Sequence, residues 1–168
     1  FANTNTAFED LPREFRELAE KLWAVHTTDY INIDPRANEA TVAFANQFKE
    51  LQEGNYYYTK HPVVHVHEVT GLKHLLLSSQ SILQFLGYTK SETDRINSIF
   101  YDYITSPENT VRWHWEQGDV IIWDNLATQH YAANDLDVFN VERLVHRVTA
   151  GRHIPVSVDG VRSEKFEF

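Results

Sequence analysis

The residues best suited to chemistry lie near the C-terminus, in two short segments that alternate like strands. The first contains His130, which follows Thr128 on the same face and comes shortly after an Asp124-Asn125 turn. An imidazole at the start of a strand can bind a metal ion. A single histidine is more often a hydrogen-bonded structural residue, so both interpretations of His130 stay open on its position alone.

The second segment, from Glu142 to Thr149, is predicted as the last strand and carries two arginines. Strand alternation places Arg143 and Arg147 on one side, roughly 13 Å apart at ~3.3 Å per residue. If that side faces the interior, the two guanidinium groups require anionic partners, because an unpaired buried charge is very unfavourable. The alternative is that they face solvent or pair with acidic neighbours, namely Glu142, Asp135 and Asp137.

Helical spacing dominates the N-terminal region. It predicts a helix from Asp10 to about Val25, with Asp10 as N-cap and Pro12 in the first turn. Residues 27–38 are rich in turn formers, and residues 40–51 form a weaker helical stretch before a tyrosine run, so this middle region is predicted to be peripheral. The apolar positions of the first helix are Leu11, Phe15, Leu18, Ala19 and Leu22.

The centre of the chain combines a predicted hairpin with a predicted helix. His61 to His67 is β-rich, and the turn at Val69–Lys73 separates it from Leu75–Leu77. For these leucines and Ile82, core packing is favoured over a role in lining a pocket. Thr89-Lys90-Ser91-Glu92 fits a capping box. The apolar face of the helix that would follow contains Ile96, Ile99, Phe100 and Tyr103.

From Asn109 onward the hydrophobic period changes to two. Val111, Trp113 and Trp115 alternate with polar residues, Gln117-Gly118-Asp119 forms a turn, and Val120–Trp123 is predicted as a buried strand. No repeat, low-complexity tract or linker interrupts the chain. Residues 1–168 are therefore predicted to form one mainly β domain with flanking helices.

Composition limits the class of protein. The 168 residues are 42% hydrophobic and 13% aromatic, so folding can bury roughly 70% of the surface of the unfolded chain. The net charge of -9, from 24 acidic and 15 basic residues, opposes binding to nucleic acid or to an anionic membrane. There is no cysteine and no long apolar run, which excludes thiolate metal sites and favours a cytoplasmic protein. Homo-oligomerisation is left open.

Several motifs together resemble one family. They cover nearly the whole chain and are dense enough to be specific. The resemblance is to the C-terminal half of taurine dioxygenase-type Fe(II)/2-oxoglutarate-dependent dioxygenases, and most to the alkylsulfatase branch. The motifs are Phe1-Ala2-Asn3-Thr4, Leu22 to His26, His61-Pro62-Val63-Val64 with His67, Glu108 to Trp113, Trp115 to Val120, Ile122 to Asn125, Thr128 to Ala132 and His146 to Thr149.

This resemblance implies a double-stranded β-helix (jelly roll) and a set of site residues. His130 matches the distal histidine of the two-histidine, one-carboxylate iron site, which leaves positions open for 2-oxoglutarate and O2. Arg143 matches the arginine that binds the far carboxylate of 2-oxoglutarate, for which a bidentate fork is suited. Arg147 matches the arginine that binds the sulfate or sulfonate end of the substrate and that also contributes to the co-substrate site.

The other two iron ligands of the family form an H-x-D motif, which is absent from these residues. In the family this motif lies upstream of the position matched by Phe1. The one H-x-E, His114-Trp115-Glu116, stands where relatives carry arginine and is not expected to replace it. The chain also lacks methionine, and we expect a processed or truncated chain without the N-terminal part. The remaining histidines are predicted to be structural: His26, His61, His65, His67, His74, His146 and His153.

The resemblance implies oxidative cleavage of a small organosulfur anion, with an alkyl sulfate ester giving an aldehyde and sulfate. A taurine, sulfonate or aryloxy-acid dioxygenase is the alternative within the family. From another class, the alternative is a non-catalytic jelly-roll module that binds an anion or mediates assembly. Hydrolases are disfavoured because the chain contains no G-x-S-x-G, H-E-x-x-H or P-loop pattern.

Overall fold

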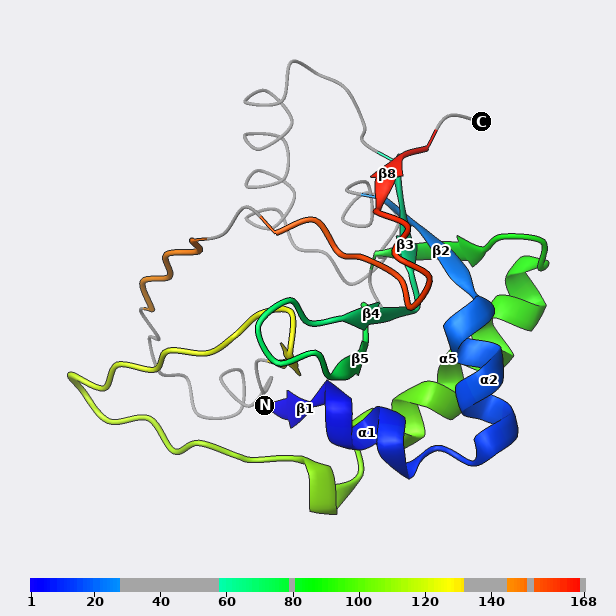
Figure 1. Cartoon of the computed structure of the whole chain (residues 1–168). Coiled ribbons are helices and arrows are strands. Elements are labelled where there is room, and N and C mark those ends of the chain that lie inside the picture. The colour runs from blue at the N-terminus through cyan, green and yellow to red at the C-terminus, as the bar shows by residue number, and fades with distance from the viewer. Residues whose placement is uncertain (28–57, 79–80, 132–144, 151–152, 167–168) are drawn as a thin grey trace.

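The structure is a computed structural model that describes residues 1–27, 58–78, 81–131, 145–150 and 153–166. The predictions for residues 28–57 lie outside these ranges, as does Arg143. The described elements, labelled in Figure 1, are β1 Ala2–Asn3, α1 Thr4–Asp10, α2 Arg13–Lys21, β2 Trp23–Thr27, β3 Tyr58–Pro62, β4 Val64–Val66, β5 Lys73–Leu75, β6 Ile82–Phe85, α5 Lys90–Ile104, a 3-10 turn at Pro107–Asn109, β7 Thr128–Gln129 and β8 Glu164–Lys165.

The described strands form three antiparallel sheets. The largest has the order β6-β2-β3-β8, and its central pair places Trp23 opposite Pro62 and Thr27 opposite Tyr58. A β4–β5 hairpin places His65 opposite His74, which confirms the predicted hairpin. The third sheet joins the start of the chain to β7, far along the sequence.

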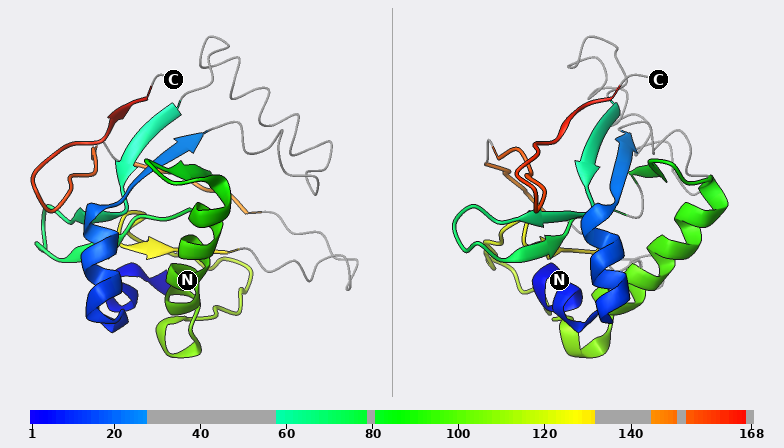
Figure 2. Two further views of the ribbon diagram at one scale, coloured as in Figure 1. Left: turned by 90° about the vertical axis from the view of Figure 1, so that its right-hand side faces the viewer. Right: turned by 45° about the vertical axis from the view of Figure 1, so that its right-hand side comes forward.

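The three described helices gather at one end of the four-stranded sheet and enclose much of the core (Figure 2). Leu75, Leu77 and Ile82 are buried there, which supports core packing over a pocket-lining role. Among the described residues, no helix has both the length and the apolar character needed to cross a membrane. The other core residues are Ala2, Ala7, Phe8, Leu11, Ala19, Leu22, Ala24, Val63, Val64, Phe85, Phe100 and Ile104.

The predicted helix from Asp10 to Val25 is wrong in its bounds. Asp10 ends α1, Pro12 caps α2, and Leu11 between them is extended with φ -62° and ψ 140°. A residue before proline is disfavoured in the helical region, because the proline ring clashes with its backbone. Val25 lies in β2, fully buried between β3 and β6.

The predicted capping box of α5 is confirmed. The Glu92 amide donates to the Thr89 hydroxyl at 3.3 Å, and the Glu92 carboxylate accepts from the Thr89 amide at 2.8 Å. Phe100 on this helix is fully buried. The box therefore fixes the start of the helix that covers the core.

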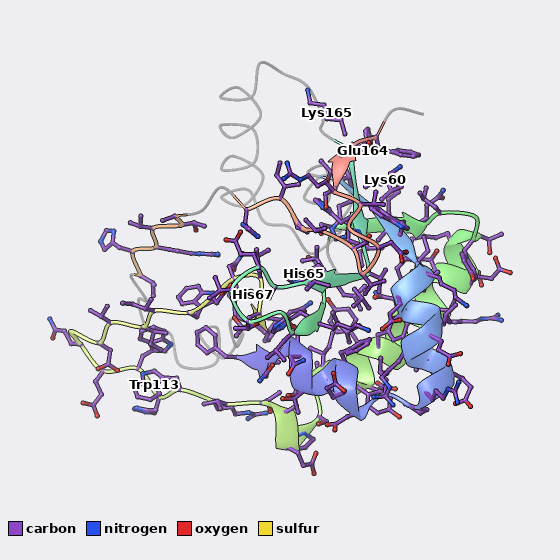
Figure 3. All side chains as sticks on the ribbon, viewed as in Figure 1. Lys60, His65, His67, Trp113, Glu164 and Lys165 are labelled. Carbon is purple, nitrogen blue, oxygen red and sulfur yellow. The ribbon has the colours of Figure 1, made fainter. Side chains whose placement is uncertain are left out.

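The predicted buried strand at Val120–Trp123 is wrong. These residues form no strand, and Val120 and Ile122 are 84% and 94% exposed. Residues 145–149 also form no strand, with Val148 95% exposed. A strand needs a neighbour for its backbone hydrogen bonds, and none of the described segments pairs with either stretch. Figure 3 shows Trp113 on the excursion that leads into the first stretch, away from the helices.

Candidate functional site

His130 directly follows β7, whose position is set by the start of the chain. β7 pairs with β1, so that Ala2 lies opposite Gln129 and Asn3 opposite Thr128. Asn3 then caps α1, because its side-chain oxygen accepts from two amides of the first turn. The strand leading to His130 is thereby tied to a helix that packs in the core.

A turn at residues 125–127 precedes β7 and is organised by Asp124. Its carboxylate accepts from the amides of Leu126 at 2.8 Å and Ala127 at 3.3 Å, and its carbonyl accepts from the Thr128 amide at 3.1 Å. Burial raises the pKa of Asp124, but the hydrogen bonds from Leu126 and from His67 outweigh it, so the pKa is lowered overall. Asp124 is therefore an anionic anchor for the turn.

The imidazole of His130 lies between two aromatic rings. The centroid of the His130 ring lies 6.1 Å from the centroid of the Phe1 ring, which stacks on it, and 5.3 Å from the centroid of the Trp123 ring. Partial burial against these neighbours lowers the pKa of His130, and the positive charge of Arg147 lowers it further. The ring is neutral at neutral pH, which is the form that binds a metal ion.

Arg147 is brought directly to this histidine. Its Nη1 lies 3.3 Å from Nε2 of His130, and its Nη2 donates to the side-chain oxygen of Asn125 at 3.2 Å. The guanidinium carbon lies 5.2 Å from the centroid of the Trp123 ring. Sequence reasoning singled out His130 and Arg147 but gave no role to Trp123 or Asn125; their places in the Trp-Asp-Asn motif were the available signal.

The donor chemistry of His130 fits one ligand position of an iron site. A guanidinium can only donate, so its contact with Nε2 means that this nitrogen presents a lone pair to a cation. Across the described ranges, no three histidine or carboxylate side chains are arranged to hold a metal. In that part of the chain, His114 and Glu116 are not assembled with His130 into such a set.

Six of the seven histidines that were predicted to be structural have a hydrogen-bond or ion-pair partner within the fold, whereas the seventh, His146, is exposed. Nδ1 of His26 lies 3.1 Å from the Ser81 hydroxyl, Nε2 of His61 lies 2.9 Å from the Thr59 hydroxyl, and His153 pairs with Glu68. His65, His67 and His74 cluster beside the turn at residues 125–127. Figure 3 shows His65 and His67 close together along the β4 hairpin.

A model of the family described as "Taurine catabolism dioxygenase TauD, TfdA family" matches residues 1–149. The chain is 41% identical over 162 residues to the alpha-ketoglutarate-dependent sulfate ester dioxygenase of Pseudomonas putida, covering 95% of this chain and 52% of that protein. It is 39% identical over 164 residues to the alkylsulfatase of Acinetobacter baylyi, covering 98% and 50%. The chain thus spans about half the length of these curated relatives.

The fold is also similar to a solved structure. A taurine dioxygenase from Burkholderia xenovorans superimposes with a TM-score of 0.70 at 28% identity, covering 99% of this chain and 51% of that one. This similarity confirms the predicted double-stranded β-helix class, of which these residues match the C-terminal portion.

Proposed function

The chain belongs to the taurine catabolism dioxygenase TauD, TfdA family, and from this membership we propose that the intact protein is an Fe(II)- and 2-oxoglutarate-dependent dioxygenase of alkyl sulfate esters. The products would be an aldehyde and sulfate. The substrate class is supported by the similarity to a sulfate ester dioxygenase and an alkylsulfatase. The observation that carries the proposal is the contact between Arg147 and His130, which joins an anion-binding group to a metal-binding group.

In this proposal three residues have distinct roles. His130 holds the iron, Arg143 binds the far carboxylate of 2-oxoglutarate, and Arg147 binds the sulfate end of the substrate and contributes to the co-substrate site. When bound, iron with 2-oxoglutarate and O2 supplies the oxidising power to remove hydrogen from a substrate carbon. Arg143 lies outside the described residues, so its role rests on the resemblance of its segment to the family.

The described neighbours prepare Arg147 for an anion. Asn125 accepts one guanidinium N–H at 3.2 Å, and the Trp123 ring lies under the guanidinium. These contacts restrict the side chain and leave other N–H groups of the planar fork to bind sulfate oxygens. A substrate whose sulfate group is bound by Arg147 would therefore lie next to His130.

The proposal also covers the domain organisation, the location and the partners of the protein. Residues 1–168 would form part of one catalytic domain, and the protein would act in the cytoplasm on a small organosulfur anion. The excess of acidic over basic residues supports a small-molecule partner over nucleic acid or an anionic membrane.

The test is succinate formation by the intact protein. With Fe(II), O2 and 2-oxoglutarate, alkyl sulfates should stimulate succinate release and should yield sulfate in equal amount. Taurine, alkyl sulfonates and aryloxy acids form the comparison panel, and stimulation by one of these alone would move the substrate class within the family. If no compound stimulates 2-oxoglutarate turnover while the protein is folded, a non-catalytic module replaces the enzyme.

A further inference from the structure

Three histidines of the β4–β5 hairpin region converge on the turn that precedes His130. The rings of His65 and His74 stack with centroids 5.5 Å apart, and His67 lies 5.7 Å from His74. All three residues are buried. Since no triad of histidine or carboxylate groups in the described part of the chain could hold a metal, the cluster requires another explanation.

His67 holds Asp124, the residue that directly precedes the turn. Its Nδ1 lies 3.2 Å from the Thr70 amide, and a backbone N–H can only donate, so Nδ1 carries the lone pair. In the neutral ring the proton therefore resides on Nε2, which donates to Oδ2 of Asp124 at 2.9 Å. Oδ1 of the same carboxylate accepts from the Leu126 amide. The hairpin and the turn are thus joined through both oxygens of one carboxylate.

His65 holds the middle of the turn. Its Nε2 lies 2.9 Å from the carbonyl oxygen of Leu126, which can only accept, so Nε2 is the donor. The side chain is fully buried, and Nδ1 has no hydrogen-bond partner among the described residues. Burial lowers the pKa of His65, so the ring acts as a neutral donor. Its Nε2–H is directed at the turn.

His74 holds the end of the turn through Thr4. The Thr4 hydroxyl donates its only proton to the Ala127 carbonyl at 2.9 Å, so it must accept from Nδ1 of His74 at 3.1 Å. The Thr4 amide also donates to the Ala127 carbonyl at 3.1 Å. Burial, followed by the neighbouring histidines, lowers the pKa of His74 to about 4. This chain links the hairpin, α1 and the turn.

We propose that His65, His67 and His74, acting through Asp124 and Thr4, form a positioning clamp that sets the orientation of His130 for metal binding. This inference rests on the proposed role of His130 as an iron ligand. Each histidine fixes a different residue of the segment 124–127, which ends directly before β7. His130 directly follows β7. Releasing one contact frees the turn to shift, and the imidazole of His130 shifts with it.

The test uses Mn(II) alone as the probe, with binding measured by electron paramagnetic resonance on the intact protein. His67→Phe keeps a ring of similar size but removes the donor to Asp124. We expect Mn(II) affinity to fall measurably, but by less than the roughly 10- to 100-fold loss found when a direct hydrogen-bond partner of a metal ligand is removed. His67→Gln restores an N–H donor and should recover much of the affinity. His26→Phe, a histidine substitution in β2, is the control and should bind Mn(II) like the wild type.

The outcomes distinguish a failure of the proposed clamp from a failure of the proposal that His130 binds iron. Loss of Mn(II) binding in His130→Ala, together with wild-type affinity in a folded His67→Phe, would overturn the clamp alone. Undiminished binding in His130→Ala would overturn both. Equal weakening in His26→Phe would show a general effect of histidine loss and would also overturn the clamp. If His67→Phe does not fold, Asp124→Asn replaces it, because its amide would oppose Nε2–H of His67; unchanged affinity there overturns the proposal.

Discussion

Nη1 of Arg147 lies 3.3 Å from Nε2 of His130, so the proposed anion-binding group touches the proposed metal ligand. The His130 ring is flanked by the rings of Phe1 and Trp123, and Arg147 contacts it at Nε2. A metal ion bound at Nε2 would replace the guanidinium at that lone pair, and an anion held by Arg147 would then lie beside the metal ion. Substitutions of Arg143 and of Arg147 should therefore change the KM values of different substrates.

Arg147→Ala should raise the KM for an alkyl sulfate, whereas Arg143→Ala should raise the KM for 2-oxoglutarate. A hydrogen bond to a charged group contributes about 1.5–3 kcal/mol, so each increase should be roughly 10- to 100-fold. Arg147→Lys is the matched variant: it keeps the charge but loses the planar fork, and should fall between Arg147→Ala and the wild type. Steady-state kinetics with each substrate varied in turn will measure the split, and the reverse pattern would exchange the two assignments.

Thr89→Ala should lower the free energy of unfolding by about 1 kcal/mol, the usual effect of losing a side-chain N-cap. Thr89 accepts from the Glu92 amide and begins the helix that carries the buried Phe100. Urea denaturation will measure the change. Thr89→Ser retains the hydroxyl and should stay near the wild type, and an equal loss in that variant would show that the hydroxyl is not the stabilising group.

Local patterns in the sequence were sufficient for several elements. The capping box needs only Thr89 and Glu92, and the hairpin needs only a turn between two short β-rich runs, so both could be predicted. At Leu11 two local signals conflict: apolar periodicity favours one continuous helix, whereas Pro12 disfavours a helical residue before it. The structure follows the proline rule.

Contacts between distant residues could not be predicted in this way. The Thr4 hydroxyl reaches the carbonyl of Ala127 across 123 positions of the chain, and no local pattern indicates such a pair. The same limit explains the error at Val120–Trp123, where a continuous apolar run indicates a preference for a buried strand but does not provide a neighbouring strand. His130 was identified through its motif, whereas the histidines behind its turn were expected only to be structural.

Stability should fall as the pH drops from about 6.5 toward 5. Burial is the main cause that lowers the pKa of five histidines in the folded state, to about 3 for His26 and about 4 for His74, with His61, His65 and His130 lowered as well. The unfolded chain binds protons at these positions below about pH 6.5 while the folded chain does not, so acid favours unfolding. Above that pH both states are neutral and no stability is lost.

The contribution of one histidine can be isolated with His26→Phe. Each proton taken up on unfolding contributes a slope of up to about 1.4 kcal/mol per pH unit. Between pH 6.5 and 5, the free energy of unfolding of His26→Phe should therefore decrease less steeply than that of the wild type, whatever its absolute stability. Denaturant titrations at several pH values will give both slopes, and parallel curves would contradict the neutral state of His26 in the fold.

Trp123 should report on metal binding at His130 by its fluorescence. The two ring centroids are 5.3 Å apart, so a paramagnetic ion such as Co(II) bound to that imidazole would lie beside the indole and quench its emission. Trp123→Phe should remove most of the Co(II)-dependent quenching in the intact protein. Trp23→Phe is the control, because Trp23 lies in β2 under the Lys60 side chain and should leave the quenching in place. If Trp123→Phe retains the full response while Trp23→Phe loses it, Co(II) binds elsewhere and His130 is not its ligand.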